Sequence, residues 1–409
     1  MTRPDLIERL AAAQAERARQ DLLRRLRKVE AVDGARIRID GRTLVNFASN
    51  DYLGLAQHPA LQEALIRAAR QWGVGATAAH LLGGHREEHE ALEEKLAGWT
   101  RRKCALLFST GYMANLGAIQ ALLGENDPGP RSRTGQTLCV QDKLNHACLI
   151  DGTRLSGAAL KRYVHADVAS AQRQLEANAD AAALLATDGV FSMDGDIAPL
   201  ADLAALCKAQ QATLMVDDAH GLGVLGAEGA GSLVEANLKQ DDAPVLMATL
   251  GKALGVGGAF VAGSKALVDG LVQFARTHIY TTAMPPAFAA ATSAAVDIAR
   301  FEDWRRAKLH RLVAHFRHGA GERGIELLDS RTPIQPVLIG ASRDASIAAQ
   351  RLEADGCFVP AIRPPTVAQG KARLRVTFSA LHEEADVEKL LNALARAIAH
   401  ARRAMKKER

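Results

Sequence analysis

Apolar and polar positions at the start of the chain follow first a helical and then a strand period. Over residues 3–29 apolar side chains recur at helical spacing, in one set at residues 6–13 and a second at 22–29, with Arg17 between them. This spacing predicts an amphipathic helix, continuous or broken, that either lies on another subunit or over a site, or packs one stripe with its other face in water. Residues 35–39 and 43–47, around Asp40-Gly41, predict a short strand pair.

From about residue 56, short apolar runs alternate with segments of helical period. The expected helices are Glu88–Trp99, Gly111–Leu123 and Leu200–Gln210, and the expected strands are Cys104–Phe108, Ala182–Thr187, Thr213–Val216, Val245–Thr249 and Gly258–Ala262. Such alternation is typical of α/β proteins, in which helices cover both faces of a mainly parallel sheet. We therefore predict this fold class for the central part of the chain.

The pattern changes near Pro285-Pro286, where a long helical run begins. Helix and short strands follow at Ala287–Ala320, Ile334–Ile339, Phe358–Ile362, Leu374–Thr377 and Glu384–Arg402. A chain of 409 residues is too long for one hydrophobic core. We expect an N-terminal helix and strand segment over 1–55, a large domain over 56–286 and a smaller α+β domain over 287–409. Pro128–Thr134 is an expected surface loop.

Composition and charge exclude several classes of protein. Hydrophobic residues make up 48% and charged residues 24%, as in folded globular proteins. The net charge is +5, but acidic residues are interspersed and aromatic residues reach only 4%. A nucleic-acid binder would gather its basic residues on one stripe with aromatic side chains for stacking. We therefore expect no nucleic-acid partner, but an enzyme that prefers anionic ligands.

The cysteines and the apolar runs bear on the compartment. Five cysteines without close pairs argue against a disulfide framework or a zinc site and favour a reducing compartment. No apolar run reaches about 18 residues, and the first residues contain no apolar signal core. We therefore expect a cytoplasmic protein with no membrane partner.

Polar residues gather where the expected strands end, at residues 109–112, 188–194, 217–221 and 249–252. Ligands collect at the carboxyl ends of strands in open parallel sheets, so these turns are expected to converge. They offer what pyridoxal 5'-phosphate (PLP) needs. N–H groups at a helix start favour its phosphate, an aspartate keeps its ring nitrogen protonated, and a lysine amine bonds its aldehyde.

Four stretches carry a resemblance to the α-oxoamine synthases. They are Ser49–Leu55, Phe191–Asp196, Val216–Gly221 and Thr249–Lys252. The resemblance covers residues from about 15 to 400 of the sequence. It implies the type I, aspartate aminotransferase-like fold with a mainly parallel seven-stranded sheet, and a PLP-dependent acyltransferase that works as a homodimer.

The resemblance also implies roles for individual residues. Lys252 would hold PLP as a Schiff base, with His146 as the second catalytic residue, stacked on the ring. The cofactor-binding residues would be Gly111, Tyr112, His146, Ser192, Asp217, His220, Thr249 and Lys252, with Thr282 reaching the phosphate of a neighbouring subunit. Substrate would lie against His146, against Arg375 through the amino-acid carboxylate, and against Arg24, Asn50, Arg363 and Thr366 along the acyl chain.

Simpler roles remain open for several of these residues. Asp218 is expected to be a turn or cap residue. Ser192 and Thr249 could cap helices, His146 and His220 could be structural, and Arg24 could lie on a solvated helix face.

Two stretches, Ala361–Val367 and Ile279–Pro286, are most similar to the family member of biotin synthesis. That member joins L-alanine to a pimeloyl thioester carried by coenzyme A or by acyl carrier protein. Glycine C-acetyltransferase and 5-aminolevulinate synthase are the nearest alternatives. A PLP-fold regulator or silent subunit is disfavoured, because the first 50 residues have no helix-turn-helix and Lys252 is present.

Two motifs point elsewhere and are set aside. His85–His89 matches the H-x-x-E-H pattern of zinc proteases, but no third ligand is evident and the resemblance implies a structural role for His89. We predict no metal. Gly251–Gly258 is rich in glycine, but its lysine precedes most of the glycines, so it is not a P-loop. Gly73–His80 and Ala368 depart from the family pattern and bear on the contour of the acyl site.

Overall fold

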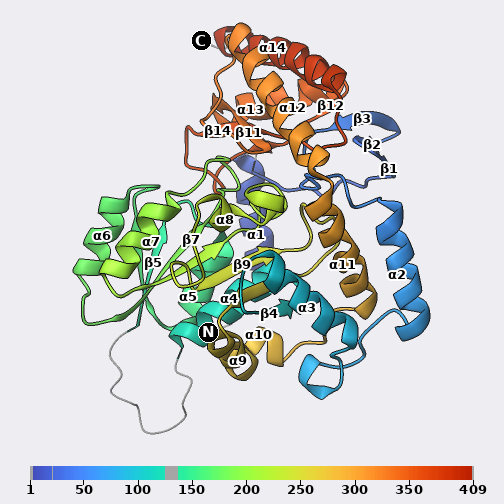
Figure 1. Ribbon diagram of the computed structural model, residues 1–409. Helices are drawn as coiled ribbons and strands as arrows, with labels where there is room; N and C mark the ends of the chain where they lie inside the picture. Colours follow the sequence, from blue (N-terminus) through green and yellow to red (C-terminus); the bar gives the residue numbers. More distant parts are fainter. Residues whose placement is uncertain (1–2, 21, 125–136, 408–409) are drawn as a thin grey trace. The chain divides into compact units, whose positions relative to one another are not determined.

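The structure is a computed structural model that describes residues 3–20, 22–124 and 137–407 (Figure 1). The chain divides into two compact units, one formed by residues 50–309 and the other by residues 1–49 with 310–409. This division differs from the boundaries expected at 55 and 286. Helix α11 (Pro286–Phe301) packs against α2 (Pro59–Trp72) and α3 (Glu87–Trp99), so its alanine-rich face belongs to the large unit. The expected loop at 128–134 lies outside the described residues.

The large unit contains a seven-stranded sheet. In spatial order its strands are β4 (Cys104–Phe108), β10 (Ala259–Gly263), β9 (Val245–Thr249), β8 (Thr213–Asp217), β7 (Ala182–Asp188), β5 (Thr137–Asp142) and β6 (Ala159–Tyr163). All neighbouring strands are parallel except β10, which runs antiparallel to both β4 and β9. The predicted α/β fold with a mainly parallel seven-stranded sheet is confirmed.

Helices pack on this sheet as the alternating pattern requires. Those that contact its strands are α3, α4 (Gly111–Leu123), α5 (Ala147–Ser156), α6 (Val168–Glu176), α7 (Leu200–Ala209) and α9 (Lys265–Phe274). The unit also contains α8 (Ser232–Glu235), α10 (Arg276–Ile279) and the 3₁₀ turns η1 (His80–Leu82) and η2 (Ala227–Gly229). Helix α4 contacts four strands of the sheet and, at its core, has Ala114, Ala118 and Ile119 fully buried. Burying one large aliphatic side chain stabilises a fold by roughly 1.5–3 kcal/mol. The apolar face of α4 therefore holds its N-terminus at the strand ends.

The N-terminal part of the small unit contains α1 (Leu6–Arg19) and the strands β1 (Ala31–Asp33), β2 (Arg36–Ile39) and β3 (Arg42–Asn46). Strands β2 and β3 form the predicted hairpin, and Asp40 and Gly41 have positive φ of 50° and 71° at its turn. Positive φ at both positions suits the tight turns that match the twist of paired strands. Of the continuous and broken alternatives for residues 3–29, the structure has a helix that ends at Arg19, after the first apolar set.

The C-terminal part of the small unit is α+β, as predicted. It contains β11 (Ile334–Gly340), β12 (Cys357–Phe358), β13 (Ala361–Ile362), β14 (Ala372–Thr377), α12 (Asp303–Glu322, which begins in the large unit), α13 (Ser342–Ala354) and α14 (Glu384–Lys407). Strands β11, β14 and β13 form one sheet, and β12 joins the β1–β3 sheet. The strand expected over 358–362 is divided because Pro360, which has no N–H, lies between β12 and β13.

The long helical run expected after Pro286 is two helices, because α11 ends at Phe301 and α12 begins at Asp303. Within the described residues, no helix combines the length and apolar character needed to cross a membrane.

Candidate active site

A cavity of about 210 Å³ lies at the carboxyl ends of the large unit's parallel strands. The residues that line it are Gly111, Tyr112, Asn115, His146, Cys148, Asp188, Val190, Ser192, Asp217, Ala219, His220, Met247, Thr249 and Lys252. Eight of the nine cofactor-binding residues predicted from the sequence are in this set. The strand-end turns therefore meet around one hollow, as the parallel arrangement required.

Lys252 stands at the beginning of a chain of hydrogen bonds. Its Nζ lies 2.8 Å from His220 Nε2, and His220 Nδ1 lies 2.6 Å from the hydroxyl of Tyr52. The Tyr52 hydroxyl in turn donates to Asn50 Oδ1 at 3.3 Å. Because Tyr52 is fully buried, its hydroxyl depends on these partners. The predicted acyl-site residue Asn50 is thus tied to the lysine through a tyrosine that the sequence analysis gave no role.

Asp217 ends β8 with its carboxylate held from two sides. Its Oδ1 accepts the N–H of Ala219 at 3.0 Å, and its Oδ2 accepts Asn115 Nδ2 at 2.7 Å. The next residue, Asp218, is also buried and accepts the N–H of Ser232 at 2.7 Å, at the start of α8. Burial raises the pKa of Asp218 to about 7. Asp217 lines the cavity, whereas Asp218 is turned toward Ser232.

The N-terminus of α4 forms another wall. Thr110 caps it, accepting the N–H of Met113 at 3.2 Å. The N–H groups at the start of a helix have no acceptor within the helix and carry the positive end of its dipole, so Gly111 and Tyr112 present donors suited to an anion. The hydroxyl of Thr249 donates to the carbonyl of Gly258 at 3.0 Å, which ties the end of β9 to the start of β10.

His146 is the N-cap of α5, and its side chain is held by Cys148. The Nδ1 atom of His146 accepts the backbone N–H of Cys148 at 3.4 Å and lies 2.8 Å from its sulfur. Asn115 Nδ2 also lies 2.9 Å from that sulfur. The imidazole is therefore fixed on one edge by a neighbour two residues away.

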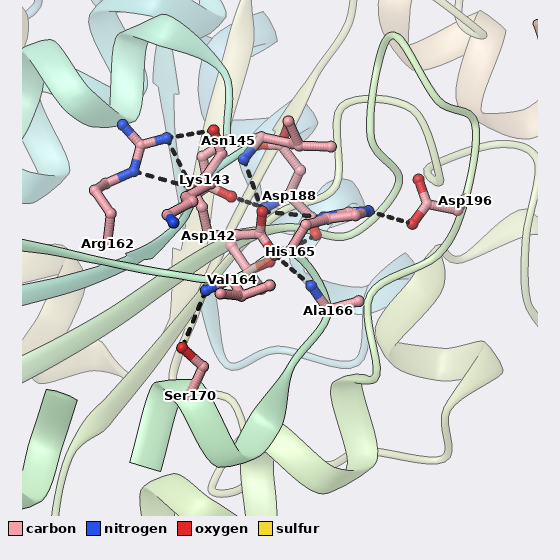
Figure 2. A network of polar contacts seen from close by, with 12 residues as sticks. Asp142, Lys143, Asn145, Arg162, Val164, His165, Ala166, Ser170, Asp188 and Asp196 are labelled. Atoms are coloured by element: carbon pink, nitrogen blue, oxygen red, sulfur yellow. Dashed lines mark hydrogen bonds and ion pairs between the residues drawn. The ribbon is translucent and has the colours of Figure 1, made fainter. Parts of the chain in front are cut away.

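A polar network joins the end of β5 to the turns after β6 and β7 (Figure 2). His165 lies between two carboxylates, with Nδ1 3.0 Å from Asp142 and Nε2 2.9 Å from Asp196. Burial alone would lower the pKa of the His165 imidazolium, but hydrogen bonds to Asp142 and Asp196 outweigh it and raise the pKa to about 10. His165 thus joins the end of β5 to the turn after β7.

Asp188 belongs to the same network and lies beside Asp217. The two residues are register partners on β7 and β8. Asp188 accepts the backbone N–H of His146 at 3.2 Å. Burial raises the pKa of Asp188 well above its ordinary value, and the charge of Asp217 adds to this. Asp188 therefore favours its neutral form beside the Asp217 carboxyl.

The remaining predicted residues lie outside this cavity. Thr282 is exposed in the large unit, where its carbonyl accepts the Ser109 hydroxyl at 3.5 Å. Arg24, Arg363, Thr366 and Arg375 belong to the small unit. Arg375 is buried in β14, with Nη1 donating to the Thr377 hydroxyl at 3.1 Å, while Arg24 is exposed. The roles given to these five residues remain predictions.

The zinc-protease-like motif gains a third imidazole, because ligand atoms of His80, His85 and His89 lie within 4.8 Å of one another. His89 is nonetheless engaged by backbone on both nitrogens. Its Nδ1 accepts the N–H of Arg86 at 2.9 Å, and its Nε2 lies 2.8 Å from the carbonyl of Met284. His89 therefore caps α3, which agrees with the structural role that the resemblance implied.

Four residues with clear positions in the site were missed from the sequence: Tyr52, Asn115, Cys148 and Asp188. Asn115 lies one helical turn beyond Gly111, and Asp188 ends an expected strand, so both positions carried a usable signal. Tyr52 lies within the Ser49–Leu55 stretch that carried the family resemblance but was given no role, and Cys148 gave no signal.

Comparison with known proteins agrees with this geometry. The family described as aminotransferase class I and II matches residues 42–394. An 8-amino-7-oxononanoate synthase of Marinobacter nauticus is 53% identical over 93% of this chain and 94% of its own length. That of Thioalkalivibrio sulfidiphilus is 55% identical over 88% and 90%. This chain belongs to the class I and II aminotransferase family.

Solved structures of the same fold extend this family assignment. Serine palmitoyltransferase of Sphingomonas wittichii superposes with a TM-score of 0.90 at 28% identity, covering 97% of this chain and 99% of its own. An 8-amino-7-oxononanoate synthase of Francisella tularensis gives a TM-score of 0.74 at 28% identity, covering 87% and 98%. The type I fold of this family, predicted from the sequence, is thus confirmed.

The cofactor of this family group is PLP, and the cavity fits it. The start of α4 offers donors for a phosphate, Asp217 offers a carboxylate for a ring nitrogen, and Lys252 offers an amine for an aldehyde. These three groups are the ones PLP requires, and they come from separate strand ends of one sheet.

Proposed function

We propose that this protein is an 8-amino-7-oxononanoate synthase of biotin biosynthesis. It condenses L-alanine with a pimeloyl thioester, carried by coenzyme A or acyl carrier protein, and releases 8-amino-7-oxononanoate, carbon dioxide and the free thiol. The observation that carries the proposal is that Lys252, Asp217 and His146 line one cavity in a chain 51–55% identical to enzymes of that name.

The cavity residues divide the work of holding the cofactor. Bound PLP supplies an electron sink that stabilises negative charge on the amino-acid Cα. Asp217 would keep its ring nitrogen protonated, and the hydrogen bond from Asn115 orients that carboxylate. The N–H groups of Gly111 and Tyr112 would bind its phosphate. Ser192, His220 and Thr249 would hold the rest, joined by Thr282 from a neighbouring subunit.

Proton transfer falls to Lys252. As general base its amine would remove the Cα proton of alanine, and the same amine would later return a proton. His220 lies 2.8 Å from that amine, so it fixes where the amine points. Arg375 would hold the alanine carboxylate and so align the Cα–H bond for removal.

The family resemblance also supplies proposed contacts for the acyl group. Asn50, Arg24, Arg363 and Thr366 are the proposed contacts, and His146 would stand beside the thioester carbonyl during attack. Support for an acyl channel comes from the setting of Arg363, which is half-buried between Ile362 and two prolines rather than fully solvated. A charge in such a setting is more suited to an anionic or polar acyl substrate than to bulk water.

We also propose a cytoplasmic homodimer. Five free cysteines suit a reducing compartment. The dimer follows from the proposed role of Thr282, which requires a second subunit. Measuring the molar mass of the holoenzyme in solution tests it, and a monomer at assay concentration would contradict it.

The decisive test is the product. The purified holoenzyme, given L-alanine and pimeloyl-coenzyme A or pimeloyl-acyl carrier protein, should yield a mass matching 8-amino-7-oxononanoate with release of carbon dioxide. Glycine with acetyl-coenzyme A is the matched alternative, and turnover of that pair alone would assign the chain to glycine C-acetyltransferase instead.

A further inference from the structure

Two cavity residues that the sequence analysis did not predict, Asn115 and Cys148, connect the Asp217 carboxylate to the His146 imidazole. Asn115 Nδ2 lies 2.7 Å from Asp217 Oδ2 and 2.9 Å from Cys148 Sγ, and Cys148 Sγ lies 2.8 Å from His146 Nδ1. Asn115, Cys148 and Asp217 are all buried. The four side chains come from α4, α5 and the end of β8, so only the folded chain brings them together.

The hydrogen positions along this connection follow from its two ends. The Asp217 carboxylate accepts hydrogen bonds, which orients the Asn115 amide with its NH₂ toward Asp217 and the thiol. Cys148 Sγ therefore receives an N–H from Asn115. Its own S–H then has His146 Nδ1 as its acceptor at 2.8 Å. The backbone N–H of Cys148 points to the same nitrogen at 3.4 Å.

The thiol keeps its proton in this setting. Burial raises the pKa of the Cys148 thiol far above its ordinary value, and the neighbouring Asp217 and Asp188 carboxyls add to the shift. A thiolate paired with a charged imidazole, the arrangement of reactive cysteines, needs electropositive surroundings that these carboxyls do not provide. Cys148 is therefore a hydrogen-bond donor.

We propose that Cys148 is a positioning residue that holds His146 in the tautomer with its hydrogen on Nε2. The imidazole then offers the cavity an N–H donor, and its basic nitrogen is occupied by the thiol. This inference rests on the proposed function for its chemical consequence: His146 donates to an oxygen of the reacting carbonyl and does not act as the base. Proton abstraction is left to Lys252.

The two variants at this position separate the proposal from a packing role. Cys148→Ser keeps a donor of similar size, and Cys148→Ala removes it. The kcat of the alanine variant should fall about fivefold or more. A fivefold change in rate corresponds to about 1 kcal/mol, the typical contribution of one hydrogen bond. KM for L-alanine should change less, and the serine variant should recover kcat. Cys207→Ala, a buried thiol in α7, is the control for simple cavity formation.

Nuclear magnetic resonance of histidine nitrogens gives a readout independent of turnover. In ¹⁵N-histidine holoenzyme, with the His146 signals assigned through His146→Asn, Nδ1 should appear as an unprotonated acceptor and Nε2 as protonated. The serine variant should match, and in the alanine variant the Nδ1 signal should move toward that of a nitrogen without a side-chain donor.

Three results would overturn the proposal. One is protonation of Nδ1 in the wild-type protein, and another is an Nδ1 signal unchanged in Cys148→Ala. The third is a serine variant as inactive as the alanine variant. Serine supplies a neutral donor but cannot replace a thiolate, so this result would indicate a thiolate–imidazolium pair instead. If the wild-type enzyme makes no 8-amino-7-oxononanoate, the proposed function fails while the tautomer assignment can still be read from the spectrum.

Discussion

At the scale of single residues, the site is a set of side chains whose orientation depends on a partner behind them. Lys252 is contacted by His220, His220 by Tyr52, and Asp217 by Asn115. Each partner is fixed by its own burial or hydrogen bond, which limits the rotamers available to the group that faces the cavity. Preorganisation of this kind lowers the cost of orienting groups during the reaction.

Replacing the lysine tests the first of these groups. In Lys252→Ala, the visible absorbance of lysine-bound cofactor should disappear and turnover should fall by orders of magnitude, because the amine that bonds the aldehyde and moves the proton is gone. Absorbance spectra and product assays measure both effects. Lys265→Ala, an exposed lysine paired with Asp269, is the control and should behave as wild type. Full activity of Lys252→Ala would refute the assignment.

Tyr52→Phe tests the tyrosine that contacts His220 behind Lys252. The change removes a buried hydroxyl from His220 Nδ1 at 2.6 Å and leaves Asn50 without its tyrosine partner. Losing such a buried bond costs about 1–3 kcal/mol, so the unfolding free energy should fall and the absorbance of bound cofactor should shift. Denaturant titration and spectra check this against Tyr280→Phe, an exposed tyrosine. Equal effects from both variants would contradict the proposed support.

At the scale of elements, the turns after β5, β6 and β7 are joined by His165. Its ring also meets Phe191 edge-on, with centroids 4.5 Å apart. The network joins residues far apart in the sequence through hydrogen bonds and ion pairs to Asp142 and Asp196 (Figure 2).

The ion pairs of His165 make a pH-dependent contribution to stability. The folded pKa of His165 is raised to about 10, above the ordinary 6.5, so its stabilisation is complete below pH 6.5 and is lost as pH rises toward 10. The difference in unfolding free energy between wild type and His165→Gln should therefore be largest near pH 6 and shrink by pH 10. Urea unfolding at several pH values measures it. A difference constant over that range would show that His165 is not charged in the folded protein.

At the scale of the whole molecule, the predicted site residues belong to two compact units. The cavity residues belong to the large unit, and the proposed carboxylate and acyl contacts Arg24, Arg363, Thr366 and Arg375 belong to the small one.

Steady-state kinetics can test the proposed role of Arg375. Arg375→Ala should raise KM for L-alanine by about tenfold to a hundredfold, because a charge-assisted hydrogen bond contributes about 1.5–3 kcal/mol, and leave KM for the thioester nearly unchanged. Arg375→Lys keeps the charge but loses the bidentate geometry, so its KM for L-alanine should lie between those of the wild type and Arg375→Ala. Steady-state kinetics with each substrate varied distinguishes them. A larger effect on the thioester would remove Arg375 from the carboxylate role.

The sequence by itself determined much of the fold and the cavity. Short apolar runs and the residues at their ends are local features, so strands such as Cys104–Phe108 and Val245–Thr249 and the turns after them could be predicted to the residue. Lys252, Asp217 and His146 were identified from those turns together with a family resemblance. Local periodicity was enough because a strand's apolar character and its end do not depend on its partner.

The tertiary structure alone decided what stands behind those residues. The antiparallel direction of β10 and the contact of Asn115 with Asp217, 102 positions later, depend on pairing across the sheet. The bond between Cys148 and His146 depends on the thiol's burial and on Asn115, neither of which a local pattern carries. Hydrogen bonds between distant segments are chosen by packing, and packing is settled only when the whole sheet is assembled.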